Sequence, residues 1–391
     1  MGLVNSDGIV IAGGGLAAQR CAEALRRNGC ERPIRMVCAE PHRPYDRPPL
    51  SKDLLTGEHA AGELPFRPAD WYEQHDVDLL LGVAAIGLLP SRRRVLLSDG
   101  AILRYEKLLV ATGSRPRMLP VLEGYENVSV LRTVDDSSRL RDALRSGPSL
   151  AVLGAGFIGL EVAATARKLG AEVTMIEAAA CPLAGVLGPQ LGEWFARLHR
   201  EQGVEVITDA TVSGVEANGV VRALKLSTGR AVASDHVVVG IGVDADVSWL
   251  RGSGLSHERG VPVDPDGRTE LEDVFVAGDA AATFDPLLGG HVPGSHWEAA
   301  GRQGARAARA MLGLEPGRAP LTSFWTDQYG VRILYLGHAR LADSFTIDGD
   351  PSRRNFTATF TRAGRPVAAL LVDRPRSLPA ARKLIENGDG S

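Results

Sequence analysis

Residues 8–40 read GIVIAGGGLAAQRCAEALRRNGCERPIRMVCAE. The apolar run from Gly8 to Ile11 predicts a buried strand, and a glycine turn then opens a helix that ends at Gly29. The segment PIRMVCAE predicts a second strand. Strand, glycine turn, helix and strand in this order form a β-α-β unit, which indicates an α/β fold with a parallel sheet.

The glycine turn of this unit has the spacing of a dinucleotide-binding loop. Gly13 permits the tight turn, Gly15 lets the backbone approach a pyrophosphate, and Ala18 allows close packing of helix on strand. The start of the helix offers free N–H groups to the phosphates. Glu40 ends the second strand, where a carboxylate can accept hydrogen bonds from ribose hydroxyls. A glycine turn that binds no ligand is the alternative reading of this motif alone.

A second unit of the same kind occupies residues 149–178, SLAVLGAGFIGLEVAATARKLGAEVTMIEA. Gly154, Gly156 and Gly159 repeat the spacing, and Glu177 ends the following strand. Glu177 would pair with an unphosphorylated ribose and repel a 2′-phosphate, and the next residues, AAACPLAG, supply no arginine to bind such a phosphate. The second unit therefore favours NADH over NADPH, or else it is a structural copy without a ligand.

Two shorter motifs follow other apolar strands. The stretch YEKLLVATGSRPR contains Ala111, Thr112 and Gly113 at a turn, and LEDVFVAGDAA contains Gly278 and Asp279, whose carboxylate can accept from sugar hydroxyls. Either could be an ordinary β-turn if it stood alone. In this order and at this spacing, the four motifs indicate two dinucleotide-binding domains.

Composition and charge argue against several other classes of protein. The 391 residues are 44% hydrophobic and 23% charged, and the net charge of −3 does not indicate a general affinity for nucleic acid or for membrane surfaces. No apolar run approaches the ~18 residues that a membrane-spanning helix needs. The four cysteines form no C-x-x-C pair, so neither a metal site nor a redox dithiol is indicated. We expect a reduced, cytoplasmic protein.

Five further stretches point to one family: PYDRPPLSK, LRTVDD, GAGFIGLEVA, SHWEAAGRQGARAARAMLG and SFWTDQYG. With them, nearly the whole chain resembles the glutathione-reductase-like flavoproteins, which have two dinucleotide folds, and among these the NADH:ferredoxin reductases. The resemblance implies bound FAD, oxidation of NADH to NAD, and reduction of a [2Fe-2S] ferredoxin that serves a cytochrome P450 or a Rieske-type oxygenase.

The resemblance also implies a domain order. Residues 1–115 and 244–320 would form an FAD-binding domain in two parts, and residues 116–243 would form the NADH-binding domain. Residues 321–391, with strand-like runs and the final helix LPAARKLIENG, would form a separate C-terminal α+β domain.

The proline-rich stretch RPYDRPPLSK contains no cysteine. Disulfide reductases of this fold carry a cysteine pair shortly after the second strand, and oxygen- and peroxide-reducing relatives carry one cysteine nearby, so a thiol relay is disfavoured. The resemblance implies that Arg47 and Lys52 reach the FAD, and that Lys52 pairs with Glu161, on the first turn of its helix, near the nicotinamide. The alternatives are a solvated basic turn and a glutamate that is favoured by the helix dipole.

The resemblance implies cofactor contacts at further positions. The full set of cofactor-binding residues that it implies is Gly13, Gly15, Leu16, Ala17, Ala18, Glu40, Arg47, Lys52, Ala85, Ala111, Thr112, Gly113, Arg132, Gly154, Gly156, Phe157, Ile158, Gly159, Glu161, Glu177, Gly242, Gly278, Asp279 and Trp297. Trp297 and Trp325 would lie near the isoalloxazine ring, although tryptophan is also a common core residue.

Three arginines form a candidate surface for the partner protein. Arg302, Arg306 and Arg309 are spaced to share one helical face, which could dock an acidic ferredoxin or could simply be solvated. The segment SRRR at 91–94 is a second candidate. The residues VPGSH before Trp297 depart from the family pattern. The resemblance therefore does not define the surface that faces the flavin or the ferredoxin at this point.

Two other functions are compatible with the same fold. One is a flavin-dependent NADH oxidase or quinone reductase, and the other is a flavoprotein scaffold like the apoptosis-inducing factors, which share RPPLSK. Rates of electron transfer to ferredoxin, quinone and oxygen would test the first alternative, and slow turnover with a long-lived charge-transfer complex after NADH would favour the second.

Overall fold

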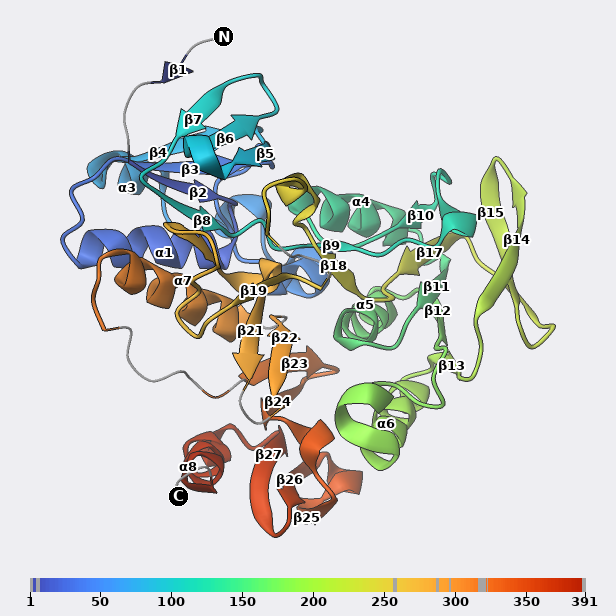
Figure 1. The fold of residues 1–391 in the computed structure, drawn as a ribbon. Coiled ribbons are helices and arrows are strands. Elements are labelled where there is room, and N and C mark those ends of the chain that lie inside the picture. Colours follow the sequence, from blue (N-terminus) through green and yellow to red (C-terminus); the bar gives the residue numbers. More distant parts are fainter. Residues whose placement is uncertain are drawn as a thin grey trace. The chain divides into compact units, whose positions relative to one another are not determined.

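The computed structural model describes residues 3–4, 8–255, 259–285, 288–294, 297–315, 321 and 323–388 (Figure 1). The chain divides into two compact units, each built from separate stretches of sequence. Unit 1 comprises Met1–Asp46, Leu64–Arg115 and Asp244–Thr322, and unit 2 comprises Arg47–Glu63, Pro116–Val243 and Ser323–Ser391. The predicted start of the last domain adjoins residues 316–320, which lie outside the described residues.

The first β-α-β unit lies at the centre of a parallel sheet in unit 1. The strand order is β20 (Val274–Val276), β8 (Lys107–Val110), β2 (Ile9–Ala12), β3 (Ile34–Cys38) and β4 (Val77–Leu81). All of β2 is buried, as expected of a strand that is covered on both faces. Helix α1 (Leu16–Arg27) ends just before the predicted Gly29, whose φ of +78° allows the left-handed turn that follows the helix.

Helix α7 (Trp297–Met311) lies side by side with α1, although the two helices are far apart in sequence (Figure 1). Gly304 permits this close approach, because a Cβ atom at that position would clash with the carbonyl oxygen of Ala17. Ala307 and Ala308 are fully buried in the same core. Helix α7 therefore packs directly against α1, the helix that follows the first glycine turn.

Smaller elements complete unit 1. One sheet contains β1 (Leu3–Val4), β7 (Ile102–Arg104), β6 (Arg94–Leu97) and β5 (Ala85–Leu89), and another contains β19 (Val261–Val263), β21 (Ala281–Asp285) and β22 (Gly290–Pro293). The helices are α3 (Ala69–Gln74), η3 (Pro90–Arg92), η5 (Ser248–Leu250) and η6 (Gly278–Ala280). The short strands β9 (Ser114–Pro116) and β18 (Val243–Ala245) pair with each other where the chain passes between its two units.

The second β-α-β unit lies in a parallel sheet of unit 2. The strand order is β10 (Val128–Ser129), β17 (His236–Val239), β11 (Ser149–Leu153), β12 (Glu172–Ile176) and β13 (Glu205–Ile207). The helices are η4 (Pro120–Leu122), α4 (Val134–Leu144), α5 (Phe157–Lys168) and α6 (Ala184–Glu201). An antiparallel sheet contains β14 (Val212–Asn218), β15 (Val220–Leu226) and β16 (Ala231–Ala233). The predicted α/β fold with two Rossmann-like parts is confirmed.

The carboxy-terminal part is an antiparallel sheet with a final helix, as predicted. The strand order is β23 (Ser323–Gln328), β24 (Val331–Gly337), β27 (Arg365–Val372), β26 (Asn355–Arg362) and β25 (Ser344–Asp350). The helices are η7 (Ala339–Leu341), η8 (Pro351–Arg353), η9 (Pro375–Ser377) and α8 (Leu378–Gly388).

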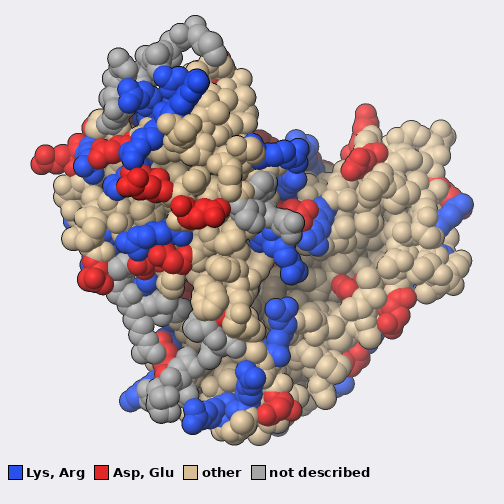
Figure 2. Space-filling model, in the orientation of Figure 1, with Lys and Arg blue, Asp and Glu red and all other residues tan. Residues whose placement is uncertain are grey.

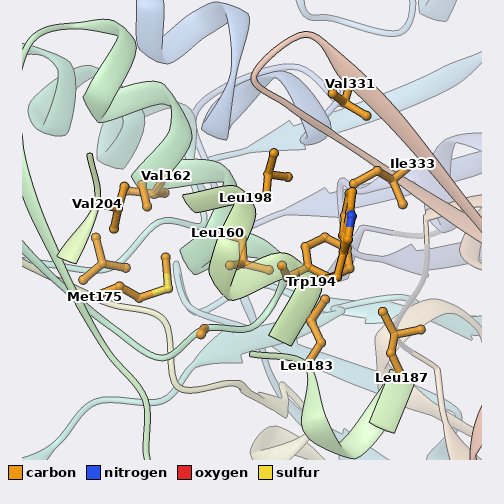
Figure 3. Close-up of a cluster of buried hydrophobic side chains, with 14 of the residues drawn as sticks. Leu160, Val162, Met175, Leu183, Leu187, Trp194, Leu198, Val204, Val331 and Ile333 are labelled. Atoms are coloured by element: carbon orange, nitrogen blue, oxygen red, sulfur yellow. The ribbon is translucent and has the colours of Figure 1, made fainter. Parts of the chain in front are cut away.

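One hydrophobic cluster contains residues of this sheet and residues of the parallel sheet of unit 2. Figure 3 shows Leu160 of α5, Trp194 and Leu198 of α6, and Val331 and Ile333 of the carboxy-terminal sheet in one cluster. Burial of apolar surface stabilises such a cluster by roughly 25 cal/mol per Å². The predicted separate domain therefore shares its core with the rest of unit 2.

Residues Arg47–Glu63 form an arm that belongs to unit 2 and contains η1 (Pro48–Ser51), α2 (Asp53–Thr56) and η2 (Ala61–Glu63). The Ser137 hydroxyl donates to the Leu50 carbonyl at 2.7 Å, and the Thr165 hydroxyl donates to the Ser51 carbonyl at 2.7 Å. Leu55 is fully buried in the shared core. The domain order expected from the sequence grouped this arm with residues 1–115, whereas its contacts here are with residues 116–243.

Charged side chains of both signs are interspersed over the face in Figure 2. Among the described residues, no helix combines the length and the apolar character that crossing a membrane requires.

Candidate functional site

The first glycine turn has the shape that a dinucleotide phosphate requires. Gly13 has a φ of +134°, and a Cβ atom there would clash with the Ala111 carbonyl oxygen. Gly15 caps α1, and the position of its missing Cβ is open, with no atom within 4 Å. The turn therefore leaves room for a ligand at the helix N-terminus, where backbone N–H groups attract anions. Leu16, Ala17 and Ala18, which begin the helix, are buried.

Glu40 follows β3, as predicted, and it is oriented by a residue that the sequence reading missed. The Tyr45 hydroxyl donates to Glu40 Oε2 at 2.5 Å. Tyr45 belongs to the PYDRPPLSK stretch, so the start of this stretch supports the carboxylate that is proposed to bind ribose. Ala85, another predicted contact, lies half-buried at the start of β5.

The predicted residues after β8 and β20 meet at one edge of the unit 1 sheet. The Ser114 hydroxyl donates to Asp279 Oδ2 at 2.6 Å, and the Thr112 hydroxyl donates to the Asp246 carbonyl at 2.6 Å. Gly113 and Gly278 both have positive φ, at +77° and +74°. The carboxyl edge of a parallel sheet is where ligands bind in such folds, and Ser114 is the residue there that sequence reasoning did not identify.

Trp297 is the first residue of α7, and its indole Nε1 donates to Asp46 Oδ1 at 2.6 Å. Asp46 lies in the PYDRPPLSK stretch and was not predicted as a site residue. The bond fixes the orientation of the indole within unit 1. Trp325 is half-buried in β23 of unit 2. The predicted proximity of both tryptophans to a flavin stays a prediction, and Ser295 and His296, within the motif before Trp297, lie outside the described residues.

The second glycine turn repeats the geometry of the first. Gly154 has a φ of +92°, and a Cβ atom there would clash with the Gly240 carbonyl oxygen. The Cβ position of Gly156, the cap of α5, is open, whereas a Cβ on Gly159 would clash with the Gly154 carbonyl oxygen. These three positions thus have the separate roles that the sequence assigned: turn, ligand approach and helix packing. Phe157 and Ile158 begin α5, and the Ile158 side chain is 45% exposed.

Glu177 directly follows β12 and contacts the second glycine turn. Its Oε2 atom accepts from the Ala155 N–H at 2.6 Å, and its Oε1 atom accepts from the Ala179 N–H at 2.8 Å. The carboxylate is therefore fixed beside the second glycine turn. Gly242 has a φ of +104°, and its carbonyl accepts from the Arg117 N–H.

Lys52 and Glu161 lie together in unit 2, with 2.8 Å between Lys52 Nζ and Glu161 Oε1. The Glu161 side chain is 5% exposed and that of Lys52 is 15% exposed. The Ser51 hydroxyl donates to Glu161 Oε2 at 2.5 Å, and the Thr326 hydroxyl donates to Oε1 at 2.7 Å. Sequence reasoning missed both hydroxyls, although each lies in a motif that it quoted.

The helix dipole does not explain Glu161. The residue is the fifth of α5, which has no acidic residue in its first turn, so the sequence-based placement on the first turn was wrong. The dipole effect falls off within that turn. The partners of the carboxylate are therefore side chains, above all the Lys52 ammonium.

Arg47 and Arg132, both predicted to contact FAD, contact each other in unit 2. Arg47 Nη1 donates to the Arg132 carbonyl at 2.6 Å. The Arg132 N–H donates to Asp136 Oδ2 at 3.1 Å, and Asp136 also completes the capping box of α4 with Thr133. The start of α4 thereby positions the arm that carries Lys52.

The predicted arginine stripe on α7 is wrong for Arg306. Its side chain is buried, and its guanidinium pairs with Asp266 at 2.5 Å and donates to the Pro265 carbonyl at 2.9 Å. An arginine with these partners is a structural residue, so it is not available to a docking protein. Arg302 pairs with Glu298, and Arg309 donates to the Glu315 carbonyl.

The SRRR segment at 91–94 remains a candidate for docking. Arg92 and Arg93 are exposed at the turn between β5 and β6, and Arg93 pairs with Asp273 at 2.8 Å. Figure 2 shows basic side chains gathered over β6 and β7 in this part of unit 1.

All four cysteines are free thiols and buried. Burial raises the pKa of the Cys38 thiol to about 12, and it also raises the pKa values of Cys21 and Cys181. Cys38 lies beside the first glycine turn, where a Cβ on Gly14 would come within 2.9 Å of its sulfur. Its thiol is protonated at neutral pH, and a protonated thiol is a poor nucleophile.

Comparison with known proteins covers nearly the whole chain. Residues 7–304 match the pyridine nucleotide-disulphide oxidoreductase family, and residues 323–390 match the reductase C-terminal family. The chain is 40% identical, over 98% of its length and 95% of the relative's, to the ferredoxin–NAD(+) reductase component of an anthranilate 1,2-dioxygenase system from Burkholderia cepacia. It is 35% identical, over 97% of its length and 96% of the relative's, to the corresponding component of a 3-phenylpropionate/cinnamic acid dioxygenase from Photorhabdus laumondii.

Among solved structures, the chain is similar to the covalent complex of putidaredoxin reductase with putidaredoxin. The TM-score is 0.94 at 32% identity, and the match covers 98% of this chain and 93% of the other. The fold, the two glycine turns and these matches agree with one another. The chain thus belongs to the pyridine nucleotide-disulphide oxidoreductases, and within them to the group of ferredoxin–NAD(+) reductases that serve oxygenase systems.

Proposed function

We propose that this oxidoreductase carries FAD and passes electrons from NADH to a [2Fe-2S] ferredoxin of a cytochrome P450 or Rieske-type oxygenase system. The observation that carries the proposal is the presence of two glycine turns with open N-caps, at Gly15 and Gly156, in a chain with the Lys52–Glu161 pair. A flavin, when bound, supplies the chemistry of accepting a hydride and returning electrons one at a time.

Unit 1 is the proposed flavin unit, and its residues favour FAD over FMN. The open turn at Gly15 suits a pyrophosphate, and Glu40, oriented by Tyr45, suits the ribose of an adenosine. FMN has neither group, so it would leave both features without a ligand. Mass spectrometry of the flavin released by denaturation tests this assignment, and recovery of FMN would contradict it.

Unit 2 is the proposed NADH unit. The α5 N-terminus at Gly156 would bind the pyrophosphate, and Glu177 would accept hydrogen bonds from the unphosphorylated ribose. Lys52 would stabilise negative charge that develops at the reacting ring, because an ammonium that is 15% exposed is only partly screened by water. Glu161 would hold that ammonium in place.

The partner assignment is tested by rapid mixing. Protein reduced with NADH is mixed with a [2Fe-2S] ferredoxin from a related oxygenase system, and in parallel with a quinone and with oxygen. We expect reoxidation by ferredoxin to be the fastest of the three. A ferredoxin rate no higher than the oxygen rate would instead favour an NADH oxidase. The cytoplasmic location expected from the cysteine pattern stays a prediction.

A further inference from the structure

A continuous chain of hydrogen bonds extends from Glu161 through the interior of unit 2. Thr326 donates to Glu161 Oε1 at 2.7 Å, and Gln328 Nε2 donates to the Thr326 hydroxyl at 3.1 Å. Gln328 Oε1 lies 3.0 Å from His199 Nε2, and the Tyr329 hydroxyl lies 2.8 Å from His199 Nδ1. The exposed fractions of Thr326, Gln328 and His199 are 0%, 1% and 0%.

The local structure explains how three elements form this chain. Thr326 and Gln328 are two residues apart in β23, so both side chains point to the same face of the sheet. His199 comes from the last turns of α6, and Glu161 comes from α5. The strand thus connects the two helices through polar groups inside an otherwise apolar core.

The donors and acceptors can be assigned along the whole chain. The Glu161 carboxylate, paired with an ammonium, only accepts, so the Thr326 hydroxyl donates to it and accepts from the Gln328 amide. The Gln328 carbonyl can only accept, so His199 carries its proton on Nε2. His199 Nδ1 then accepts from the Tyr329 hydroxyl. Every hydrogen bond therefore points toward Glu161, an arrangement in which neighbouring bonds polarise one another.

The state of His199 agrees with this assignment. Burial lowers the pKa of His199 to about 4, so the ring is neutral at pH 7 and one of its nitrogens is free to accept. The rings of His199 and Tyr329 also lie in edge contact, with centroids 5.0 Å apart.

Tyr329 is held in an unfavourable backbone conformation. It occupies the turn between β23 and β24 with a φ of +52°, in the left-handed region that residues other than glycine rarely adopt. The tight turn before Gly330 would accept asparagine or glycine more readily. The tyrosine there provides the hydroxyl that completes the chain at His199.

We propose that Thr326, Gln328 and His199, anchored by Tyr329, are positioning residues that hold the Glu161 carboxylate and, through it, the Lys52 ammonium in the geometry that hydride transfer needs. This inference rests on the proposed function of the Lys52–Glu161 pair. If Thr326 and Gln328 have this role, the carboxy-terminal sheet supports the hydride-transfer site as well as contributing to the core.

The first test removes one hydroxyl while keeping the shape of the side chain. We expect Thr326→Val, loaded with FAD, to slow flavin reduction at saturating NADH about tenfold, because a hydrogen bond to a charged group is lost. The apparent Kd for NADH should change less than about twofold. Thr326→Ser, which restores the hydroxyl, should recover the parent rate to within about threefold. Thr357→Val is the matched control, since it makes the same change in β26 of the same sheet.

The outcomes separate this inference from the proposed function. Lys52→Met should slow flavin reduction if the pair serves hydride transfer. A slow Lys52→Met protein together with an unchanged Thr326→Val protein would overturn the positioning role alone, and so would a Thr326→Ser protein as slow as Thr326→Val. An unchanged Lys52→Met protein would overturn the assigned role of the pair itself.

The second test does not depend on turnover. Nitrogen-15 NMR of the nine histidines, with the His199 signals identified by their loss in His199→Gln, should show a proton on Nε2 and none on Nδ1 at pH 7. In Tyr329→Phe the Nδ1 signal should shift, because its hydrogen-bond donor is gone. A proton on Nδ1, or an unshifted signal in Tyr329→Phe, would overturn the proposed chain.

Discussion

Glu161 illustrates what a sequence can and cannot reveal about a single residue. Its pairing with Lys52 was expected from a family resemblance, and the two groups lie 2.8 Å apart. The Ser51 and Thr326 hydroxyls that also bond it are 110 and 165 residues away in sequence, so no local pattern could identify them. The hydrogen bonds that orient a buried carboxylate come from tertiary structure, which spacing rules do not reach.

Nucleotide preference should depend on Glu177. In Glu177→Arg we expect kcat/KM for NADPH relative to NADH to rise at least about tenfold, because a repelling carboxylate is replaced by a group that binds a 2′-phosphate. The change also removes the bonds to the Ala155 and Ala179 N–H groups, so some activity with both nucleotides should be lost. Glu177→Gln separates the two effects, since it retains an acceptor without the charge. An unchanged preference in Glu177→Arg would contradict the assignment.

His199 should make unit 2 less stable in acid. Its pKa is about 4 in the folded protein and near 6.5 when unfolded, so between these values the unfolded chain binds the extra proton and stability falls as pH falls. By pH 5 the loss is about 2 kcal/mol. We expect the drop in melting temperature from pH 7 to pH 5 to be smaller in His199→Gln than in the parent. Equal drops would show that His199 does not contribute.

At the scale of elements, the close contact between α1 and α7 depends on a missing side chain. Replacing Gly304 by alanine would normally favour a helix, but here the new methyl group would meet the Ala17 carbonyl. We expect Gly304→Ala to destabilise unit 1 by about 2 kcal/mol and to lower the fraction of protein that retains flavin. Gly185→Ala in α6, where the Cβ position is open, is the control and should be neutral or slightly stabilising. Melting curves and flavin content measure both effects.

Elements were the scale at which the sequence was most informative. The strand expected from Gly8 to Ile11 is found at Ile9–Ala12, and both glycine turns open helices as predicted. Hydrophobic runs and glycine spacing are local signals, which explains this agreement. The arginine stripe on α7 failed because helical periodicity shows which residues share a face, but not whether that face is covered; Arg306 is covered and pairs with Asp266.

At the scale of the whole molecule, the carboxy-terminal sheet supplies part of the hydrophobic core of unit 2. A chain that stops at Glu315 would lack Ile333, Phe356 and their neighbours, and would expose Leu160 and Trp194. We expect this truncated protein to be insoluble, or to bind a hydrophobic dye strongly and to lose NADH binding. A truncated protein that stays soluble and binds NADH with the parent's affinity would contradict the shared core.

The assignment of the arm to unit 2 could not be predicted from the sequence. Its proline-rich motif gave a stiff segment that carries a lysine, but the hydrogen bonds that attach it join Leu50 to Ser137 and Ser51 to Thr165, 87 and 114 residues apart. Domain boundaries in a chain that crosses repeatedly between units follow such long-range contacts rather than composition.

The grouping of Arg47–Glu63 with unit 2 has a practical consequence for protein engineers who exchange modules between relatives. A chimera that transplants only residues 116–243 would combine the glutamate of one parent with the lysine and the supporting Ser51 and Thr326 hydroxyls of the other. A chimera that is designed to keep the Lys52–Glu161 pair with its own supporting hydroxyls should exchange three segments together: 47–63, 116–243 and 323–391. All other residues would come from the second parent.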